Sequence, residues 1–279
     1  MPNLVYLNSR YIPFKDAKIP IEDRGFQFSD SVYEVVKIIN KKILDFDFHM
    51  RRLKFSTSEL KFNFKVNSKL LNKIFQNLII KNKLSNGIIY LQITRGVQLR
   101  EHAYKKNLKP NVIVYTAKKK FNLPNKNYRG FKAITYPDIR WGRPDIKTTS
   151  LLANIIAATE ASKKGAYETI LVKGKKITEA AHSNVWIVKG NKIITHPANK
   201  EILKGVTRTV LINIIKSLGF KLIEKEFSLK ELYKSDEVFI TSSGSLVTPI
   251  IQIDSIKINN KKIGNITKNL ALSFYKSII

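Results

Sequence analysis

The chain has 279 residues, 43% of them hydrophobic, which is enough to bury the core of one large domain or two moderate ones. It contains no cysteine, which excludes disulfides, thiolate nucleophiles and cysteine-ligated metals; together with the absence of a secretory-type start, this leads us to expect a cytoplasmic protein. Lys and Arg number 50 against 21 Asp and Glu, and no apolar run approaches the roughly 18 residues that cross a bilayer, so we expect no membrane partner.

The first third of the chain predicts strands followed by two helices. Residues 31–39, SVYEVVKII, are rich in β-branched and aromatic side chains and predict a strand, with a turn at 40–42. Residues 47–62 have helical spacing. A second amphipathic helix is predicted over 67–84, capped by Asn67 or Ser68. Its apolar stripe consists of Leu70, Leu71, Ile74, Phe75, Leu78 and Ile79.

Two further strands are predicted at 87–96 and 111–117, before a polar, basic stretch over 118–130 that is interrupted by Pro124. This stretch resembles a linker, so we predict a small N-terminal domain over 1–120 and a larger domain over 121–279. The second domain mixes strands and helices. The predicted class is α+β.

Lys147 stands just before an apolar helix. Pro144 disfavours helix ahead of it, and Thr149 or Ser150 could cap the helix that follows. The predicted apolar face of that helix is Leu151, Leu152, Ile155 and Ile156. A lysine desolvated there would have a lowered pKa and could form a Schiff base with an aldehyde cofactor. An exposed first-turn lysine is the alternative.

Three other segments could serve a phosphorylated, nitrogen-containing ring. Gly205 precedes Val206, Thr207 and an apolar helix, whose first N–H groups would suit a phosphate. The hydroxyl-rich turn at 241–244 could donate to the same phosphate, and Glu179 could pair with a pyridinium nitrogen. An ordinary capped helix, a plain turn and a salt bridge to a lysine are the respective alternatives.

Eight motifs, taken together and in this order, resemble the class IV pyridoxal-phosphate aminotransferases. They are DRGFQFSDSVYEVV, HMRRL, ITRG, DIKTTSLLAN, GAYETILV, TEAAHSNVW, HPANKEILKGVTR and FITSSGSLVTPI. The resemblance implies fold type IV, with a small N-terminal α/β domain and a larger C-terminal pseudo-barrel domain, and it implies a homodimer. It also makes pyridoxal 5'-phosphate the cofactor and amino acids and 2-oxo acids the substrates, with no metal.

Residue by residue, the resemblance implies that Lys147, on the large domain, is the Schiff-base lysine and that Glu179 faces the pyridine nitrogen. Arg52 would grip the phosphate, since a guanidinium fork suits phosphate oxygens. Leu203 would pack on the ring. The remaining phosphate contacts would come from Val206, Thr207 and Ser243.

Within the family, the D-amino acid (D-alanine) aminotransferases are the most similar branch. Their carboxylate trap resembles Arg100 and His102, which lie two apart and can point the same way in an extended loop, assisted by Tyr33. We therefore predict transamination between a D-amino acid and 2-oxoglutarate or pyruvate. Branched-chain L-amino acid aminotransferase and aminodeoxychorismate lyase are the alternatives. On the predicted strand 31–39, next to Tyr33, Glu34 falls on the apolar face and needs a partner that the sequence does not identify.

Four positions depart from the family pattern. Ser29 and Ser31 stand where relatives usually have glycine, and Ala181 and His182 stand where they usually have serine. His182 is expected to affect hydrogen bonding near Glu179.

A different class of function, nucleic-acid binding through the net charge of +29, is disfavoured because the lysines are spread from end to end, so no specific nucleic-acid partner is expected.

Overall fold

The computed structural model describes residues 3–278, which divide into two compact units. Unit 1 takes the chain up to Lys120 together with Ile146–Ser150, and unit 2 comprises Phe121–Asp145 and the chain from Leu151 onward. Lys147 therefore packs with the first unit, although the sequence analysis assigned it to the second domain. The reason is backbone pairing: the N–H of Tyr33 donates to the carbonyl of Lys147 at 3.0 Å.

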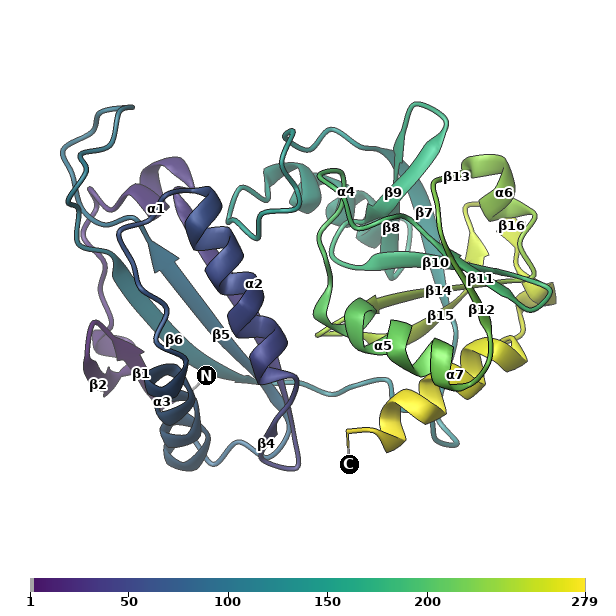
Figure 1. Ribbon diagram of the computed structural model, residues 1–279, viewed down its shortest axis with the longest axis horizontal. Helices are drawn as coiled ribbons and strands as arrows, with labels where there is room; N and C mark the ends of the chain where they lie inside the picture. Colours follow the sequence, from purple (N-terminus) through teal and green to yellow (C-terminus); the bar gives the residue numbers. More distant parts are fainter. Residues whose placement is uncertain (1–2, 279) are drawn as a thin grey trace. The chain divides into compact units, whose positions relative to one another are not determined.

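Unit 1 is built on a six-stranded sheet, β2-β1-β6-β5-β3-β4, in which every pair is antiparallel (Figure 1). The strands are β1 (Leu4–Leu7), β2 (Arg10–Pro13), β3 (Ser31–Ile39), β4 (Lys42–Ile43), β5 (Gly87–Thr94) and β6 (Asn111–Lys118). The helices are α1 (Arg24–Phe28), α2 (Phe46–Glu59) and α3 (Ser68–Lys81), with a short 3-10 turn at Phe14–Asp16. The predicted strands over 31–39, 87–96 and 111–117 and the two predicted helices are confirmed in type, whereas α1 was not predicted.

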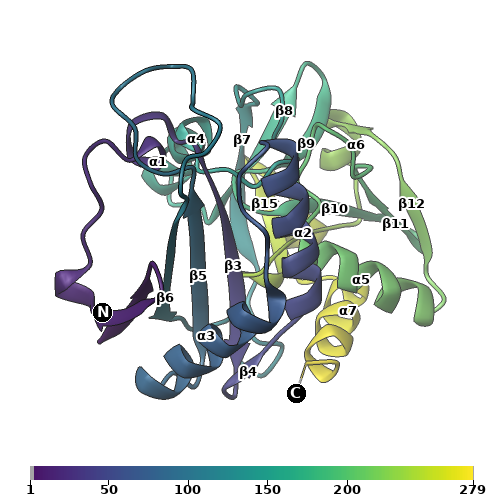
Figure 2. The ribbon, with the colours of Figure 1, turned by 60° about the vertical axis from the view of Figure 1, so that its left-hand side comes forward.

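Helices α2 and α3 cover one face of this sheet (Figure 2). The side chain of Asn67 caps α3 by accepting from the N–H of Leu70 at 3.0 Å. Five of the six residues in the predicted stripe are buried against the sheet, whereas Leu70 is half exposed in the first turn. Alternate residues of the central strands, among them Val36 and Leu91, complete this core because strand side chains alternate between faces.

The opposite face of the sheet carries a row of tyrosines. Tyr33, Tyr90 and Tyr115 occupy three neighbouring strands, and their rings stack with centroid separations of 5.6 and 5.0 Å. All three remain partly accessible. Stacked aromatic pairs across strands stabilise a sheet, and here they also form an aromatic wall beside Lys147.

Unit 2 contains a ten-stranded mixed sheet, β12-β11-β10-β14-β15-β7-β8-β9-β13, with β16 paired to β15. Its strands are β7 (Phe131–Pro137), β8 (Glu168–Lys173), β9 (Lys176–Ala180), β10 (Asn184–Lys189), β11 (Lys192–Thr195), β12 (Lys221–Glu224), β13 (Phe227–Ser228), β14 (Glu237–Ser242), β15 (Leu246–Ile253) and β16 (Ile256–Lys257). β7 runs parallel to both β8 and β15, and β11 runs parallel to β12. β9 and β10 contact each other although four strands separate them in the sheet order, so the sheet curls, as the predicted pseudo-barrel requires.

Helices α5 (Val206–Ser217) and α7 (Asn265–Lys276) pack on this sheet and on each other, with α4 (Leu152–Lys163), α6 (Leu229–Tyr233) and a 3-10 turn at Asn259–Lys261 completing the unit. The start of α4 differs from the prediction. No side chain caps it, and its large apolar residues Leu152, Ile155 and Ile156 are exposed. The small residues Ala157 and Ala161 face inward instead, because they let the helix lie close to the sheet. No helix within residues 3–278 is long and apolar enough to span a membrane.

Candidate active site

The ten residues predicted to form the site fall into two sets, one in each unit. Unit 1 carries Tyr33, Arg52, Arg100, His102 and Lys147, and unit 2 carries Glu179, Leu203, Val206, Thr207 and Ser243. Each set is built around a buried carboxylate that an arginine holds.

Lys147 lies against the tyrosine row of unit 1. Its Nζ atom is 4.1 Å from the centroid of the Tyr33 ring, and its side chain is half buried. Its backbone N–H donates to the hydroxyl of Ser56 on α2 at 3.2 Å, while its carbonyl accepts from the N–H of Tyr33. The two backbone bonds fix the base of the side chain, and the ring faces the amine. The structure thus holds the Lys147 amine at a defined place.

Arg52 is gripped by the carboxylate that the sequence left without a partner. Its Nε and one terminal nitrogen donate to the two oxygens of Glu34 at 2.8 and 2.7 Å, a bidentate pair. His49 adds a third bond to Glu34 at 2.7 Å. Burial by itself raises the pKa of Glu34, but the charge and hydrogen bonds of Arg52 outweigh it and lower the pKa to about 2. Glu34 is therefore a fixed anion that orients the guanidinium of Arg52.

Arg100 and His102 are brought together on one aromatic ring. The guanidinium of Arg100 lies 4.8 Å from the centroid of Phe28, and the His102 ring lies 5.6 Å from it. Arg24 sets this loop by donating to the carbonyls of Glu101 and His102 at 2.7 and 3.0 Å. Both predicted residues are exposed. Within residues 3–278, neither makes a direct hydrogen bond or ring contact with Tyr33, and the joint role of the three stays a prediction.

Glu179, the last residue but one of β9, is held by three donors. Asn184 donates to one of its oxygens at 3.0 Å, and the N–H of Leu203 donates to the other at 3.1 Å. The third donor is the guanidinium of Arg140, in a close ion pair. Arg140 is shared, because it also pairs with Asp138 at 2.8 Å. This arginine, not a lysine, is the charge partner of Glu179, and the sequence reasoning missed it although DIRWGRPDIK places it seven residues before Lys147.

The surroundings of Glu179 poise it between two charge states. Its burial raises its pKa to about 7, Arg140 opposes this shift, and the negative charge of Asp138 adds to it. A carboxyl that titrates near neutral pH can hold or release a proton under working conditions. This is the electrostatic setting expected of a group that faces a basic ring nitrogen.

The start of α5 has no side-chain cap at Gly205, which precedes Val206 and Thr207. A Cβ atom at Gly205 would lie 2.1 Å from the side-chain oxygen of Asn184, so only glycine fits there. Asn184 also donates to the carbonyl of Leu203 at 2.9 Å, which ties the approach to this helix to the Glu179 cluster. The predicted phosphate seat and the predicted nitrogen partner are thus joined by one asparagine.

Ser243 lies in the turn between β14 and β15. Its neighbours Ser242 and Ser245 bond to each other through their hydroxyls at 2.7 Å, and the Thr241 hydroxyl accepts from Trp186 at 2.9 Å. Those hydroxyls stiffen the turn. Ser243 itself is half buried, and its contact with a phosphate stays a prediction.

The four departures from the family pattern have local explanations. Ser29 ends α1 in the left-handed region with φ 54°, the conformation that glycine adopts most easily. Ser31 is buried, and its hydroxyl bonds with that of Thr149 and accepts from Gln92. Ala181 packs beneath α4. His182 pairs with Glu168 at 3.1 Å, so the expected effect on Glu179 is not seen as a direct contact.

Comparison with known proteins gives this geometry a family. The sequence profile of the Amino-transferase class IV family matches residues 31–253. The chain is 36% identical over 277 residues to a D-alanine aminotransferase of Listeria innocua, a match covering 99% of this chain and 96% of that protein. The chain belongs to the class IV aminotransferases. The predicted family is therefore confirmed.

Solved structures of this class share the fold. The branched-chain amino acid aminotransferase of Escherichia coli superposes with a TM-score of 0.91 at 23% identity, covering 99% of this chain and 94% of that one. The same enzyme from Thermobaculum terrenum, in its PLP form, gives 0.89 at 21% identity, with 99% and 94% covered. The fold-type-IV prediction is thus confirmed. The protein is an aminotransferase, and class IV aminotransferases depend on pyridoxal phosphate.

Proposed function

We propose that this aminotransferase moves the amino group of a D-amino acid, such as D-alanine, to a 2-oxo acid such as 2-oxoglutarate or pyruvate. The observation that carries the proposal is the near full-length similarity to D-alanine aminotransferases. The placement of Arg100 and His102 on the Phe28 ring supports it, because both side chains then offer donors to one carboxylate from the same platform.

The residues present fit pyridoxal phosphate. Glycine is required at Gly205, before the start of α5, where no side chain caps the helix and the helix dipole suits a phosphate, and the buried carboxyl of Glu179 suits a pyridine nitrogen. Lys147 would supply the covalent attachment, and Arg52, oriented by Glu34, would hold phosphate oxygens. When bound, the cofactor accepts the amino group and acts as an electron sink.

Each of the predicted side chains would then have a separate role in the reaction. The Lys147 amine, held at Tyr33, would take the α-proton of the substrate as a general base. Arg100 and His102 would bind the α-carboxylate, so that the α C–H bond faces that amine. Glu179, whose anionic form Arg140 favours, would hold a proton at the ring nitrogen.

The donor specificity is tested by assaying the cofactor-loaded enzyme with D-alanine and L-leucine. We expect turnover of D-alanine, and we expect Arg100→Gln to raise its KM by about tenfold or more through loss of a charged carboxylate contact. L-leucine turnover with no D-alanine turnover would overturn the proposal in favour of a branched-chain enzyme. Release of 4-aminobenzoate from aminodeoxychorismate would favour the lyase.

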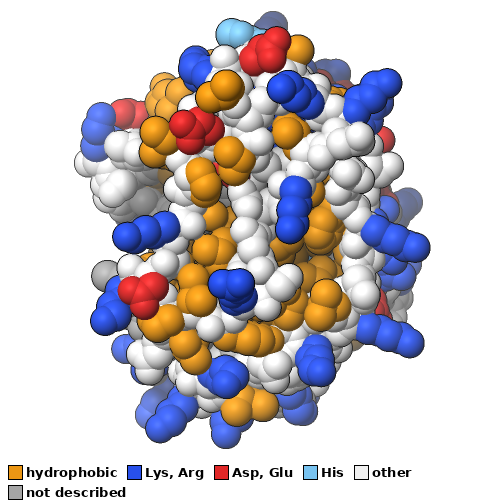
Figure 3. Space-filling model, turned by 90° about the vertical axis from the view of Figure 1, so that its left-hand side faces the viewer, with side chains coloured by type: hydrophobic (Ala, Val, Ile, Leu, Met, Phe, Trp, Pro, Cys, Tyr) orange, Lys and Arg blue, Asp and Glu red, His pale blue; other side chains and the backbone are white. Residues whose placement is uncertain are grey.

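We also propose a homodimer. Large apolar side chains stay exposed in each unit, among them Ile21, Phe26 and Leu99 in unit 1 and Leu152 and Ile155 in unit 2. Figure 3 shows hydrophobic side chains gathered across one face with Lys and Arg around them. Exposed apolar surface of this kind is typical of subunit interfaces. Light scattering that gives the mass of a monomer would contradict the dimer.

The proposed compartment is the cytoplasm, which fits a cysteine-free chain.

A further inference from the structure

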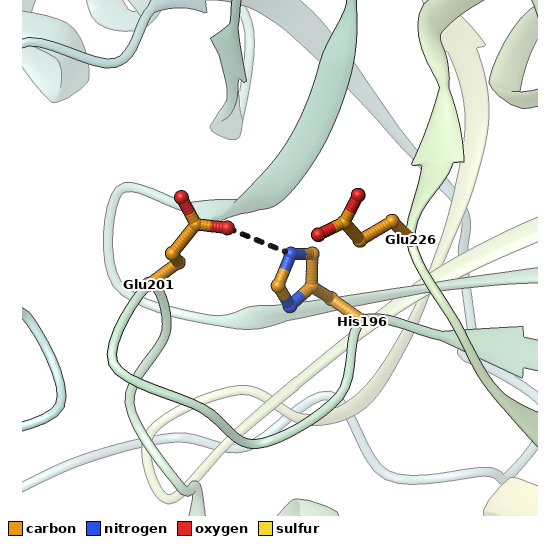
Figure 4. A group of neighbouring side chains, drawn as sticks. All are labelled: His196, Glu201 and Glu226. Carbon is orange, nitrogen blue, oxygen red and sulfur yellow. Dashed lines mark ion pairs between the residues drawn. The ribbon is translucent and has the colours of Figure 1, made fainter.

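A histidine and two glutamates converge in unit 2 outside the residues assigned above. His196 follows β11, Glu201 lies in the loop leading to α5, and Glu226 lies between β12 and β13. One ligand atom from each lies within 4.8 Å of the others, and Figure 4 shows both carboxylates pointing toward the same edge of the imidazole. The three come from separate segments that the fold brings together.

The imidazole is set up to bind a cation. Its Nδ1 lies 2.9 Å from the carbonyl of Pro197, which can only accept, so Nδ1 carries a hydrogen and Nε2 is the ring nitrogen left to bind a metal ion. The His196 side chain is 2% exposed, and Nε2 lies 3.6 Å from an oxygen of Glu201. A carbonyl behind one ring nitrogen and open coordination at the other is the usual arrangement of a metal-binding histidine.

We propose that His196, Glu201 and Glu226 bind a divalent transition-metal ion, with Zn²⁺ matching the set best. One imidazole and two carboxylates balance its charge, and water would complete the coordination. Tetrahedral ligands about 2.0–2.1 Å from zinc are about 3.3 Å apart, so small side-chain movements close the site. Both glutamates retain enough exposure to make that adjustment.

Two lysines compete with the ion. Lys173 pairs with Glu201 at 2.8 Å, and Lys176 makes a close pair with Glu226. Both ammonium groups are mostly exposed, so they can turn outward when a cation enters. The lysines weaken the site without blocking it, and this gives the test a variant that should bind better.

The bound ion would link three segments: the end of β11 through His196, the loop before α5 through Glu201, and the turn between β12 and β13 through Glu226. The carbonyl of Glu201 accepts from Arg140 at 3.2 Å, and Leu203, two residues on, donates to Glu179. The metal would therefore stabilise the segment that holds the Glu179 cluster, without contacting the cofactor residues.

The experiment is calorimetric titration of Zn²⁺ into the cofactor-loaded enzyme after dialysis against a chelator. We expect Glu226→Gln to weaken the tightest binding step by about tenfold or more, and Lys176→Gln to tighten it several-fold because a competing charge is gone. His182→Gln is the matched control, since His182 is an exposed histidine beside a single carboxylate. It should leave that step unchanged.

Thermal unfolding gives a second measure. Zn²⁺ should raise the Tm of the wild-type protein and of Lys176→Gln, but not of Glu226→Gln. Equal affinity in wild type and Glu226→Gln, weaker binding in Lys176→Gln, or displacement of Zn²⁺ by an equal concentration of Mg²⁺ would each overturn the site. The exposed positions of Glu226 and Lys176 make both variants safe for folding.

Discussion

Two buried glutamates, one in each unit, show how differently the same ion pair can be used. Glu34 and Glu179 are both held by an arginine, yet the pKa of Glu34 lies at about 2 and that of Glu179 at about 7. Glu34 has Arg52 in a bidentate pair. Glu179 shares Arg140 with Asp138, whose negative charge works against its ionisation. Burial raises the pKa of both carboxyls; at Glu34 the charges and hydrogen bonds of Arg52 and His49 outweigh it, whereas at Glu179 those of Arg140 do not, and Asp138 adds a small further rise.

The largest effect is expected from removing the Lys147 amine. Lys147→Ala should lower transamination by about 1,000-fold or more and abolish the long-wavelength absorbance of bound cofactor, because both the proposed covalent attachment and the proposed general base are lost. The exposed Lys164→Ala is the control. Activity near the wild-type level in Lys147→Ala would remove the basis of the site.

Glu34→Gln tests the permanent anion. It leaves the Arg52 charge poorly compensated and should lower the free energy of unfolding at pH 7 by about 3 kcal/mol. A lowered pKa in the folded state means stability that is present above about pH 4.5 and lost as the pH falls toward about 2, so the variant should lack this acid loss. Urea unfolding across that range measures both effects.

The exposed Glu160→Gln, which removes only a surface pair with Lys163, should leave the unfolding free energy nearly unchanged at every pH. If Glu34→Gln behaved in the same way, the carboxylate would not be the anchor of Arg52.

Arg140→Gln tests the titratable carboxyl. Without the guanidinium, the pKa of Glu179 should rise further above about 7, so less of it is anionic at neutral pH. Activity at pH 7 should fall by about tenfold, and the acid limb of the pH profile should move to higher pH. Arg143→Gln, which alters a nearby arginine paired with Asp145, should leave the profile in place.

The stability of the cofactor-free protein offers the complementary measurement. A raised pKa in the folded state means that the contribution of Glu179 is present below about pH 4.5 and is lost as the pH rises through about 7. The two glutamates should thus give opposite slopes of stability against pH. Slopes of the same sign would show that the contrast between them is wrong.

Ser29→Gly should have the smallest effect. Ser29 adopts φ 54° at the end of α1, where glycine is less strained, so the change should stabilise the protein by up to about 1 kcal/mol at every pH. Ser58→Gly, inside α2, should destabilise it by a similar amount. A pH-dependent gain in Ser29→Gly would mean that the substitution disturbs a titrating group.

The sequence by itself determined the family and the type of most elements and named candidate site residues, because these depend on local spacing. The periodicity of 67–84 predicted α3, with Asn67 or Ser68 as its cap, and the order of eight motifs indicated the family and made Lys147 and Glu179 candidate site residues. The uncapped start of α4 and its exposed apolar side chains were not predicted, since periodicity finds an apolar stripe but not what covers it.

Only the tertiary structure determined which charged side chains lie next to each other. Arg140 reaches Glu179 across 39 positions, Arg52 reaches Glu34 across 18, and His196 meets Glu226 across strands. In a chain with 50 basic residues, no spacing rule selects the one guanidinium that lies beside a given carboxylate. Partner choice depends on strand register and on the curl of the sheet, and these arise from the packing of the whole unit.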